Sequence, residues 1–102
     1  VKPRNNKFKI YNENCITGCP KHIKSNSIDL IINDAPFGIG EDDIGTRYAR
    51  HEDNVIKGYV EVPVSTYEKF AMDVMVEVER TLRKGGSAYI FSGFQNLRHF
   101  LN

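Results

Sequence analysis

The sequence lacks a long apolar run, since no stretch approaches the roughly 18 residues needed to span a bilayer. Its start, Val1 to Lys9, is polar and basic, without the apolar core that a signal peptide carries. We therefore expect a cytoplasmic protein that does not associate with a membrane.

The chain also has few cysteines and almost no net charge. The two cysteines, Cys15 and Cys19, are too few for the disulfide framework of a small secreted domain. The 14 basic and 13 acidic side chains nearly cancel, so no global field attracts the chain to nucleic acid or anionic lipid. Any contact with DNA must come from a local patch.

Metal ligands are few. Cys15, Cys19 and His22 lie close in sequence, but a structural zinc site needs four ligands and no good fourth residue is nearby. We predict no metal site and interpret the two thiols as small buried side chains.

Apolar runs predict strands. Ser27 to Ile32 is nearly continuously apolar, which is typical of a strand buried on both faces of a parallel sheet. The alternating stretch Phe8 to Tyr11 predicts a short first strand. Between them, Pro20 to Lys24 is expected to form one helical turn with Pro20 at its first position.

One long helix is clearly predicted. Apolar residues recur at three- and four-residue steps and form a single stripe: Tyr67, Phe70, Ala71, Val74, Met75, Val78 and Leu82. Ser65 and Glu68 have the spacing of a capping box at its start. We place Arg80, Arg83 and Lys84 in its last turn, and Gly85-Gly86 is expected to end it.

The last part of the chain repeats this alternation of strand and helix. Ser87 to Ser92 predicts a second buried strand, with Tyr89 and Phe91 in the sheet core, and Leu97, Phe100 and Leu101 begin another amphipathic helix. The order strand, helix, strand, helix indicates the α/β class, with parallel strands and crossover helices. We interpret residues 1–102 as a single partial domain.

Gly38 to Pro63 shows little periodicity and is predicted to be a long loop. It contains residues suited to gripping DNA phosphates or entering the base stack, namely Arg47, Tyr48, Arg50, His51, Lys57 and Tyr59. The alternative is a solvated loop whose cations are balanced by its acidic residues, Glu41, Asp42, Asp43, Glu52 and Asp53. Both interpretations stay open at this point.

Asp34-Ala35-Pro36-Phe37 follows the apolar run directly. Ligands of open parallel sheets bind beyond the carboxyl ends of the strands. We therefore expect a carboxylate, a main-chain carbonyl and an aromatic ring to be presented together at a ligand site, which Ser92 and Gly93 border from the second strand.

The stretch Ile28 to Gly38 resembles the catalytic motif of the amino-methyltransferases that act on DNA, in which Asp, Asn or Ser is followed by Pro, Pro and an aromatic residue. Lys9 to Cys15 is similar to the opening of those members whose catalytic motif precedes the cofactor motif. Glu79 to Gly93 is similar to their next helix and strand. The resemblance implies part of a Rossmann-like sheet that uses S-adenosylmethionine.

The resemblance also implies roles for individual residues. Asp34 and the Ala35 carbonyl would orient the exocyclic amine of a base, Phe37 would stack on the flipped base, and Pro36 would fix the loop. Asn14, Cys15 and Asp34 would contact the cofactor. The implied partners are duplex DNA and either the remainder of the enzyme or a second copy of the chain.

Three features depart from the family pattern. Ala35 stands where proline is usual, Asn12-Glu13-Asn14-Cys15 replaces Asn-Gly-Asp-Cys, and the cofactor motif Phe-x-Gly-x-Gly is absent. We expect half of the cofactor site to be missing from these 102 residues.

The implied reaction is methylation of adenine N6 in duplex DNA. Three alternatives stay open. They are methylation of cytosine N4, a non-catalytic fragment or subunit that needs another polypeptide, and N-methylation of RNA or a protein amide.

Overall fold

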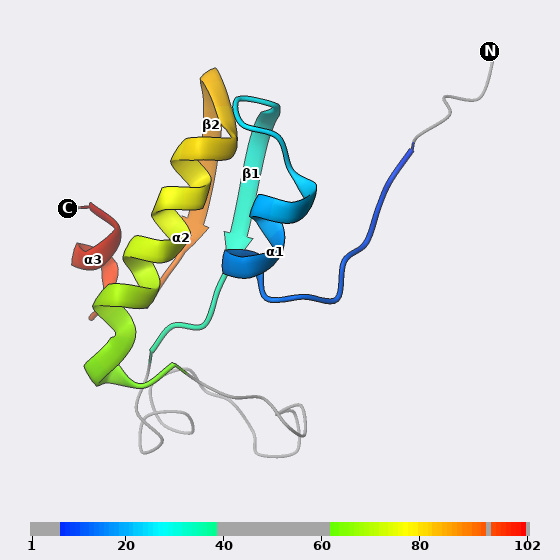
Figure 1. Cartoon of the computed structure of the whole chain (residues 1–102). Helices are drawn as coiled ribbons and strands as arrows, with labels where there is room; N and C mark the ends of the chain where they lie inside the picture. Colours follow the sequence, from blue (N-terminus) through cyan, green and yellow to red (C-terminus); the bar gives the residue numbers. More distant parts are fainter. Residues whose placement is uncertain (1–6, 39–61, 94, 102) are drawn as a thin grey trace, which may run out of the picture.

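The computed structural model describes residues 7–38, 62–93 and 95–101 (Figure 1). Its elements follow the order α1 (Cys15–His22), β1 (Ile28–Asp34), the 3-10 turn η3 (Val64–Thr66), α2 (Tyr67–Thr81), β2 (Leu82–Phe91) and α3 (Leu97–Leu101). β1 and β2 pair in parallel and α2 connects them through the chain. The α/β class with a parallel sheet is therefore confirmed.

The apolar stripe of α2 forms the core, as predicted. Tyr67 and Ala71 are 0% exposed, Val74 is 2% exposed and Val78 is 8% exposed. The predicted capping box is wrong, because Ser65 lies inside η3 and Thr66 is the residue before the helix. The Thr66 hydroxyl donates to the Pro63 carbonyl instead of capping α2.

α2 ends four residues before the first of the two glycines that were expected to stop it. Its last residue is Thr81, so Leu82, predicted as the end of the stripe, belongs to β2, as do Arg83 and Lys84. The main-chain amides of Asn26 and Ser27 donate to the carbonyls of Arg80 and Thr81, at 2.9 Å each. These bonds satisfy carbonyls that the helix end leaves without partners, so no glycine cap is needed.

The strand register shows that Gly85 and Gly86 lie in an irregular part of β2. Ile28 pairs with Leu82, whereas Leu30 already pairs with Ser87, so β2 bulges between these positions. Gly85 adopts a φ of +80° in this bulge, a conformation that side chains with a Cβ rarely adopt. From Leu30 to Asp34 the pairing with β2 is regular.

The prediction that β1 and β2 are buried on both faces is wrong. Leu30 and Ile32 are 51% and 67% exposed, and Tyr89 and Phe91 are 63% and 55% exposed. Successive strand residues point to opposite faces, and these four positions share one face through the register. In the described part of the chain, α1 and α2 pack on the other face, which leaves this one open.

The first predicted strand is also wrong. Phe8 and Ile10 are 81% and 84% exposed, and the segment runs away from the body of the protein as an extended arm (Figure 1). A strand needs a hydrogen-bonded neighbour, and the sheet of the described residues contains only β1 and β2.

α1 is longer than the predicted turn. It begins at Cys15 because the Asn14 side chain accepts a hydrogen bond from the Ile16 amide at 2.9 Å and caps the helix. Pro20 consequently lies inside α1 and not at its first position.

Two valines of α2 provide a test of this packing. Val74→Ala should lower the free energy of unfolding by about 1–3 kcal/mol, because it removes buried methyl groups. Val76, 59% exposed on the same helix, is the matched control, and Val76→Ala should change stability by less than about 0.5 kcal/mol. Urea unfolding followed by circular dichroism measures both, and equal losses would contradict this placement of the core.

Candidate functional site

Asp34 is the last residue of β1 and pairs with Phe91, the last residue of β2. Because the strands are parallel, Ser92 and Gly93 leave the sheet at the edge where Asp34 stands. The Asp34 side chain is exposed, and its carboxylate has no hydrogen-bond or ion-pair partner among the described residues. The motif therefore lies at a strand end, with an acceptor group available to a ligand.

The loop after Asp34 is attached to the helices through its main chain. The Tyr67 hydroxyl donates to the Pro36 carbonyl at 2.7 Å, and the Asn96 amide nitrogen donates to the Phe37 carbonyl at 2.8 Å and the Gly38 carbonyl at 3.3 Å. Tyr67 is fully buried and Asn96 is 5% exposed. Ala35, Pro36 and Phe37 are half-buried.

Sequence reasoning missed both donors. The spacing of Tyr67 indicates only a place in the core stripe, and Asn96 lies in no motif. Their acceptors lie 31 and 58 to 59 residues away along the chain, so no local spacing could indicate these contacts.

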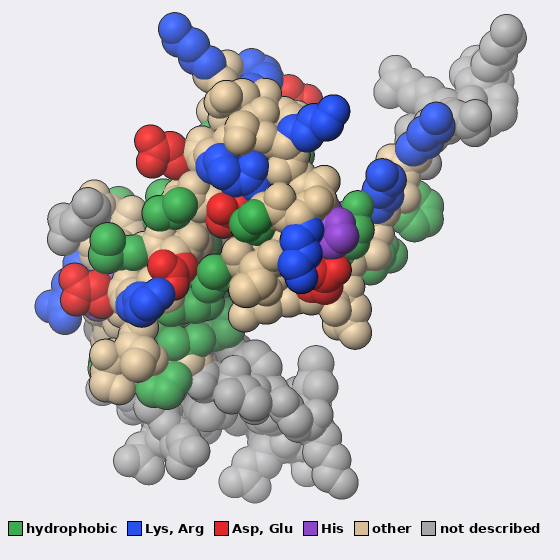
Figure 2. All heavy atoms as spheres, viewed as in Figure 1, with side chains coloured by type: hydrophobic (Ala, Val, Ile, Leu, Met, Phe, Trp, Pro, Cys, Tyr) green, Lys and Arg blue, Asp and Glu red, His purple; other side chains and the backbone are tan. Residues whose placement is uncertain are grey.

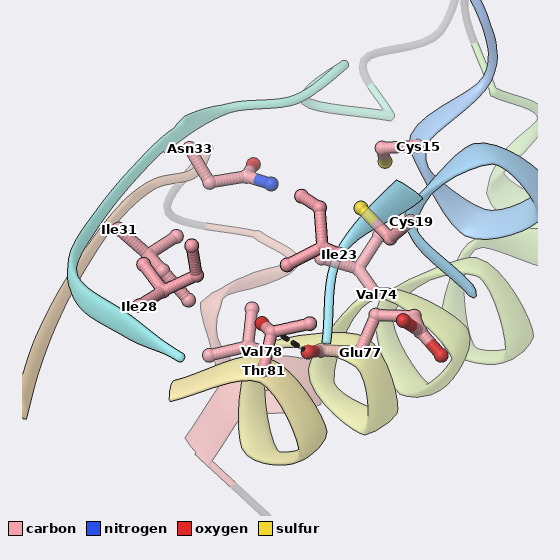
Figure 3. Close-up of a pocket in the computed structure, with 10 residues that line it drawn as sticks. All are labelled: Cys15, Cys19, Ile23, Ile28, Ile31, Asn33, Val74, Glu77, Val78 and Thr81. Carbon is pink, nitrogen blue, oxygen red and sulfur yellow. Dashed lines mark hydrogen bonds between the residues drawn. The ribbon is translucent and has the colours of Figure 1, made fainter. Parts of the chain in front are cut away.

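The residues expected to contact the cofactor lie near the same end of β1. Cys15 and Asn33, the residue before Asp34, line one hollow of about 150 Å³ (Figure 3). Asn14 and Cys15 also line a neighbouring hollow of about 120 Å³. The structure thus brings the first turn of α1 close to the carboxyl end of β1, although the Asn14 side-chain oxygen is engaged by the Ile16 amide.

The larger hollow lies between α1, β1 and α2 and is mainly apolar (Figure 3). The Asn33 amide reaches into it, and its buried oxygen has no hydrogen-bond partner within the described residues. The Glu77 carboxylate accepts from Arg80 at 2.6 Å. Asn33 and Asp34 point to opposite faces of the sheet, so this hollow and the Asp34 carboxylate lie on different sides of β1.

The two thiols differ in their surroundings. Cys15 is exposed, so the prediction that both thiols are buried is wrong for this residue, whereas Cys19 is partly buried. Burial raises the pKa of the Cys19 thiol above its ordinary value, and Cys15 and Glu77 raise this pKa further, while Arg80 opposes them. Across the described ranges, no group of three or more metal-ligating side chains occurs.

The residues predicted to bind DNA, Arg47, Tyr48, Arg50 and Lys57, lie outside the described residues. Within the described part, Lys24, Arg83 and Lys84 lie at the amino ends of the strands, opposite to Asp34. Lys and Arg side chains accordingly predominate at the top of the view in Figure 2. They cannot serve a ligand bound at the carboxyl ends of the strands.

Comparison with known proteins gives one informative similarity. The chain is similar to the type II methyltransferase M.HpaI of Haemophilus parainfluenzae, with 32% identity over 79 residues. The match covers 78% of this chain and 21% of the relative, so the chain spans about a fifth of that protein's length. The similarity supports a methyltransferase family.

The other comparisons add no relative. No protein-family model matches the chain, and no solved structure matches it. None of the described helices is long and apolar enough to cross a membrane.

The unequal surroundings of the thiols predict unequal reactivity. Because the thiolate is the nucleophile, the raised pKa and partial burial of Cys19 should make its alkylation by iodoacetamide at pH 8 slower than that of Cys15. Mass spectrometry of the chain quenched at intervals measures both rates. Faster modification of Cys19 than of Cys15 would contradict the partial burial of Cys19.

Proposed function

We propose that this chain carries the catalytic loop of a DNA methyltransferase that transfers a methyl group from S-adenosylmethionine to N6 of adenine in duplex DNA. The observation that carries the proposal is the placement of Asp34-Ala35-Pro36-Phe37 at the carboxyl end of β1, with a carboxylate that is unpaired among the described residues and a main chain fixed by hydrogen bonds. The similarity to M.HpaI, a type II methyltransferase, supports the methyl-transfer part of the proposal.

Asp34 and Ala35 supply the acceptors that an exocyclic amine requires. Such an amine is a poor nucleophile because its lone pair is delocalised into the ring. Hydrogen bonds to the Asp34 carboxylate and the Ala35 carbonyl draw its two hydrogens aside and bring the nitrogen toward tetrahedral geometry. Alignment of a held pair of reactants can lower a barrier by several kcal/mol.

Phe37 and Pro36 hold the base in this proposal. A base cannot be reached inside the duplex, so it must be rotated out of the stack and bound against an aromatic or apolar face. The half-buried ring of Phe37 is suited to this role, because its main chain is anchored through Asn96. The ring of Pro36 fixes φ next to that anchor.

The residues present fit only part of S-adenosylmethionine, which supplies the methyl group when it is bound. Asn14 and Cys15, on one side of β1, and Asp34, on the other side, are the residues that would hold it, so the bound molecule would have to pass across the carboxyl end of β1. The hollows beside α1, of about 120 and 150 Å³, are too small to enclose the whole molecule. We infer that further cofactor contacts come from outside the described residues.

The fold family, the substrate contacts and the location are part of the same proposal. A parallel sheet joined by α2 is compatible with part of a Rossmann-like methyltransferase sheet. Duplex DNA is the proposed substrate, and Arg47, Tyr48, Arg50 and Lys57 are its proposed phosphate and base contacts. We propose that the protein acts in the cytoplasm, together with the remainder of the enzyme or a second copy.

Cytosine N4 is the second candidate target, because its exocyclic amine would meet the same two acceptors. Mass spectrometry of nucleosides separates the two products. The test uses DNA from a bacterial host that lacks its own DNA methyltransferases and expresses the complete gene. We expect N6-methyladenine, whereas N4-methylcytosine would reassign the target base and neither product would contradict the proposed function.

Replacing Asp34 tests the catalytic assignment. Asp34→Ala should reduce transfer of tritiated methyl groups to duplex DNA about a hundredfold or more, which corresponds to losing about 3 kcal/mol of transition-state stabilisation. The fold should persist because the side chain is exposed. Asp29→Ala, at the exposed start of the same strand, is the matched control and should keep its activity. Full turnover by Asp34→Ala would remove this motif from the catalytic centre.

Ala35→Pro tests the departure from the family pattern. The substitution keeps the carbonyl and stiffens the loop, so we expect equal or higher methyl transfer in the same assay. A large loss of activity in a folded protein would mean that the loop needs the freedom of alanine at this position.

The cofactor site gives a separate prediction. The 102-residue chain lacks the Phe-x-Gly-x-Gly motif. By itself it should bind S-adenosylmethionine with a Kd above about 10 μM, equivalent to a binding free energy weaker than about −7 kcal/mol. Calorimetric titration measures this affinity. Tighter binding would show that the main cofactor contacts lie within these residues.

A further inference from the structure

We propose that Tyr67 and Asn96 are positioning residues, which fix the main chain of the loop so that the Ala35 carbonyl is left as the acceptor for the target amine. The proposal rests on the proposed function. Neither side chain is placed against the substrate, so both act through the loop.

The first argument is how the loop carbonyls are used. Three consecutive carbonyls, those of Pro36, Phe37 and Gly38, accept hydrogen bonds from Tyr67 or Asn96. The Ala35 carbonyl has no such partner among the described residues. The donors therefore select which main-chain oxygen beside Asp34 stays open to a ligand.

The second argument is the close approach at Gly38. This residue has a φ of +68°, and a Cβ built on it would overlap Cδ2 of Tyr67 and lie 2.7 Å from the Asn96 side-chain nitrogen. The loop can therefore reach both donors only because no side chain stands at position 38. The left-handed conformation of Gly38 and the two donors form one contact.

The third argument is that the donors are themselves fixed. The Tyr67 ring contacts the rings of Phe70, His99 and Phe100, at centroid distances of 5.4, 6.1 and 6.0 Å. The main-chain N–H of Asn96 donates to the Gly93 carbonyl, and the main-chain carbonyl of Asn96 accepts from the main-chain N–H of His99. α2 and the segment that leads into α3 therefore both hold the loop.

These contacts address the departure at position 35. The family that the sequence resembles usually has a proline at position 35, before the one that corresponds to Pro36, and its ring restricts the loop. In this chain the restriction would come from Tyr67 and Asn96, acting on the three residues that follow Ala35. A proline at position 35 should therefore substitute in part for a missing donor.

The test compares variants of the protein expressed from its complete gene. Tyr67→Phe removes only the hydroxyl, and Asn96→Asp removes the amide donor at nearly constant size. Tyr89→Phe and Asn26→Asp, at exposed positions, are the matched controls. We expect kcat for methyl transfer to fall about tenfold to a hundredfold in the first pair, with KM for DNA within about twofold, because misplacement of reacting groups acts mainly on the chemical step. The controls should match the unaltered protein.

The rescue experiment separates positioning from a general loss of stability. Adding Ala35→Pro to Tyr67→Phe or Asn96→Asp should recover several-fold of the lost kcat. Loss of the hydroxyl bond should also shift the ¹³C resonance of the Pro36 carbonyl in Tyr67→Phe, whereas Tyr89→Phe leaves this resonance unchanged.

The outcomes separate failure of the positioning role from failure of the proposed function. A shifted Pro36 resonance with unchanged kcat in both donor variants would overturn the positioning role alone. Reduced kcat that Ala35→Pro fails to raise in either variant would also overturn it. Absence of methyl transfer in the unaltered protein would overturn the proposed function and this proposal with it.

Discussion

The hydrogen bond from the Tyr67 hydroxyl to the Pro36 carbonyl joins the core of the protein to its candidate site. Tyr67 is the first residue of α2 and the largest fully buried side chain among the described residues. A buried hydroxyl needs a partner, since an unsatisfied polar group costs about 1–3 kcal/mol. The partner here is the loop after β1, so burial of the first turn of α2 also determines where the loop lies.

The opposite end of α2 fixes β1 in a similar way. The last carbonyls of the helix accept hydrogen bonds from Asn26 and Ser27, and the Arg80 guanidinium donates to the Ile23 carbonyl at 2.9 Å. Both ends of α2 therefore contact the chain that flanks β1. The parallel pairing with β2 then determines the position along the sheet at which β1 ends with Asp34. A rigid strand end is what a site needs if it must place a carboxylate within about 0.5 Å.

The uncovered face of the sheet is the main difference between this structure and a self-contained parallel domain. Parallel sheets normally carry helices on both faces. Leu30, Ile32, Tyr89 and Phe91 are apolar yet exposed on one face. The Asp34 side chain points toward the same face by strand alternation, so the surroundings of its carboxylate are incomplete within the described residues.

Sequence patterns predicted the elements whose signals are local. The stripe of α2, the strand that contains Ile28 to Ile32 and the short α3 each follow from apolar spacing, and the structure confirms them. Asp34-Ala35-Pro36-Phe37 also stands at a strand end, as predicted.

The errors arose where distant contacts decide the outcome. Phe8 to Tyr11 has strand composition, but pairing depends on a neighbour that local sequence cannot supply. The end of α2 is set by Asn26 and Ser27, which lie more than fifty residues earlier, and not by Gly85-Gly86. The contacts of Asn96 with the loop were unpredictable for the same reason.

The central claim is that a flipped target base stacks on Phe37 beside Asp34. Photochemical cross-linking tests it directly, with the complete protein and duplex DNA that carries 5-iodouracil in place of the methylated base. We predict that the cross-link, located by mass spectrometry, falls on Phe37, and that Phe37→Leu abolishes it while DNA binding persists. Cross-linking of that base only to residues outside Asp34 to Phe37 would contradict the account.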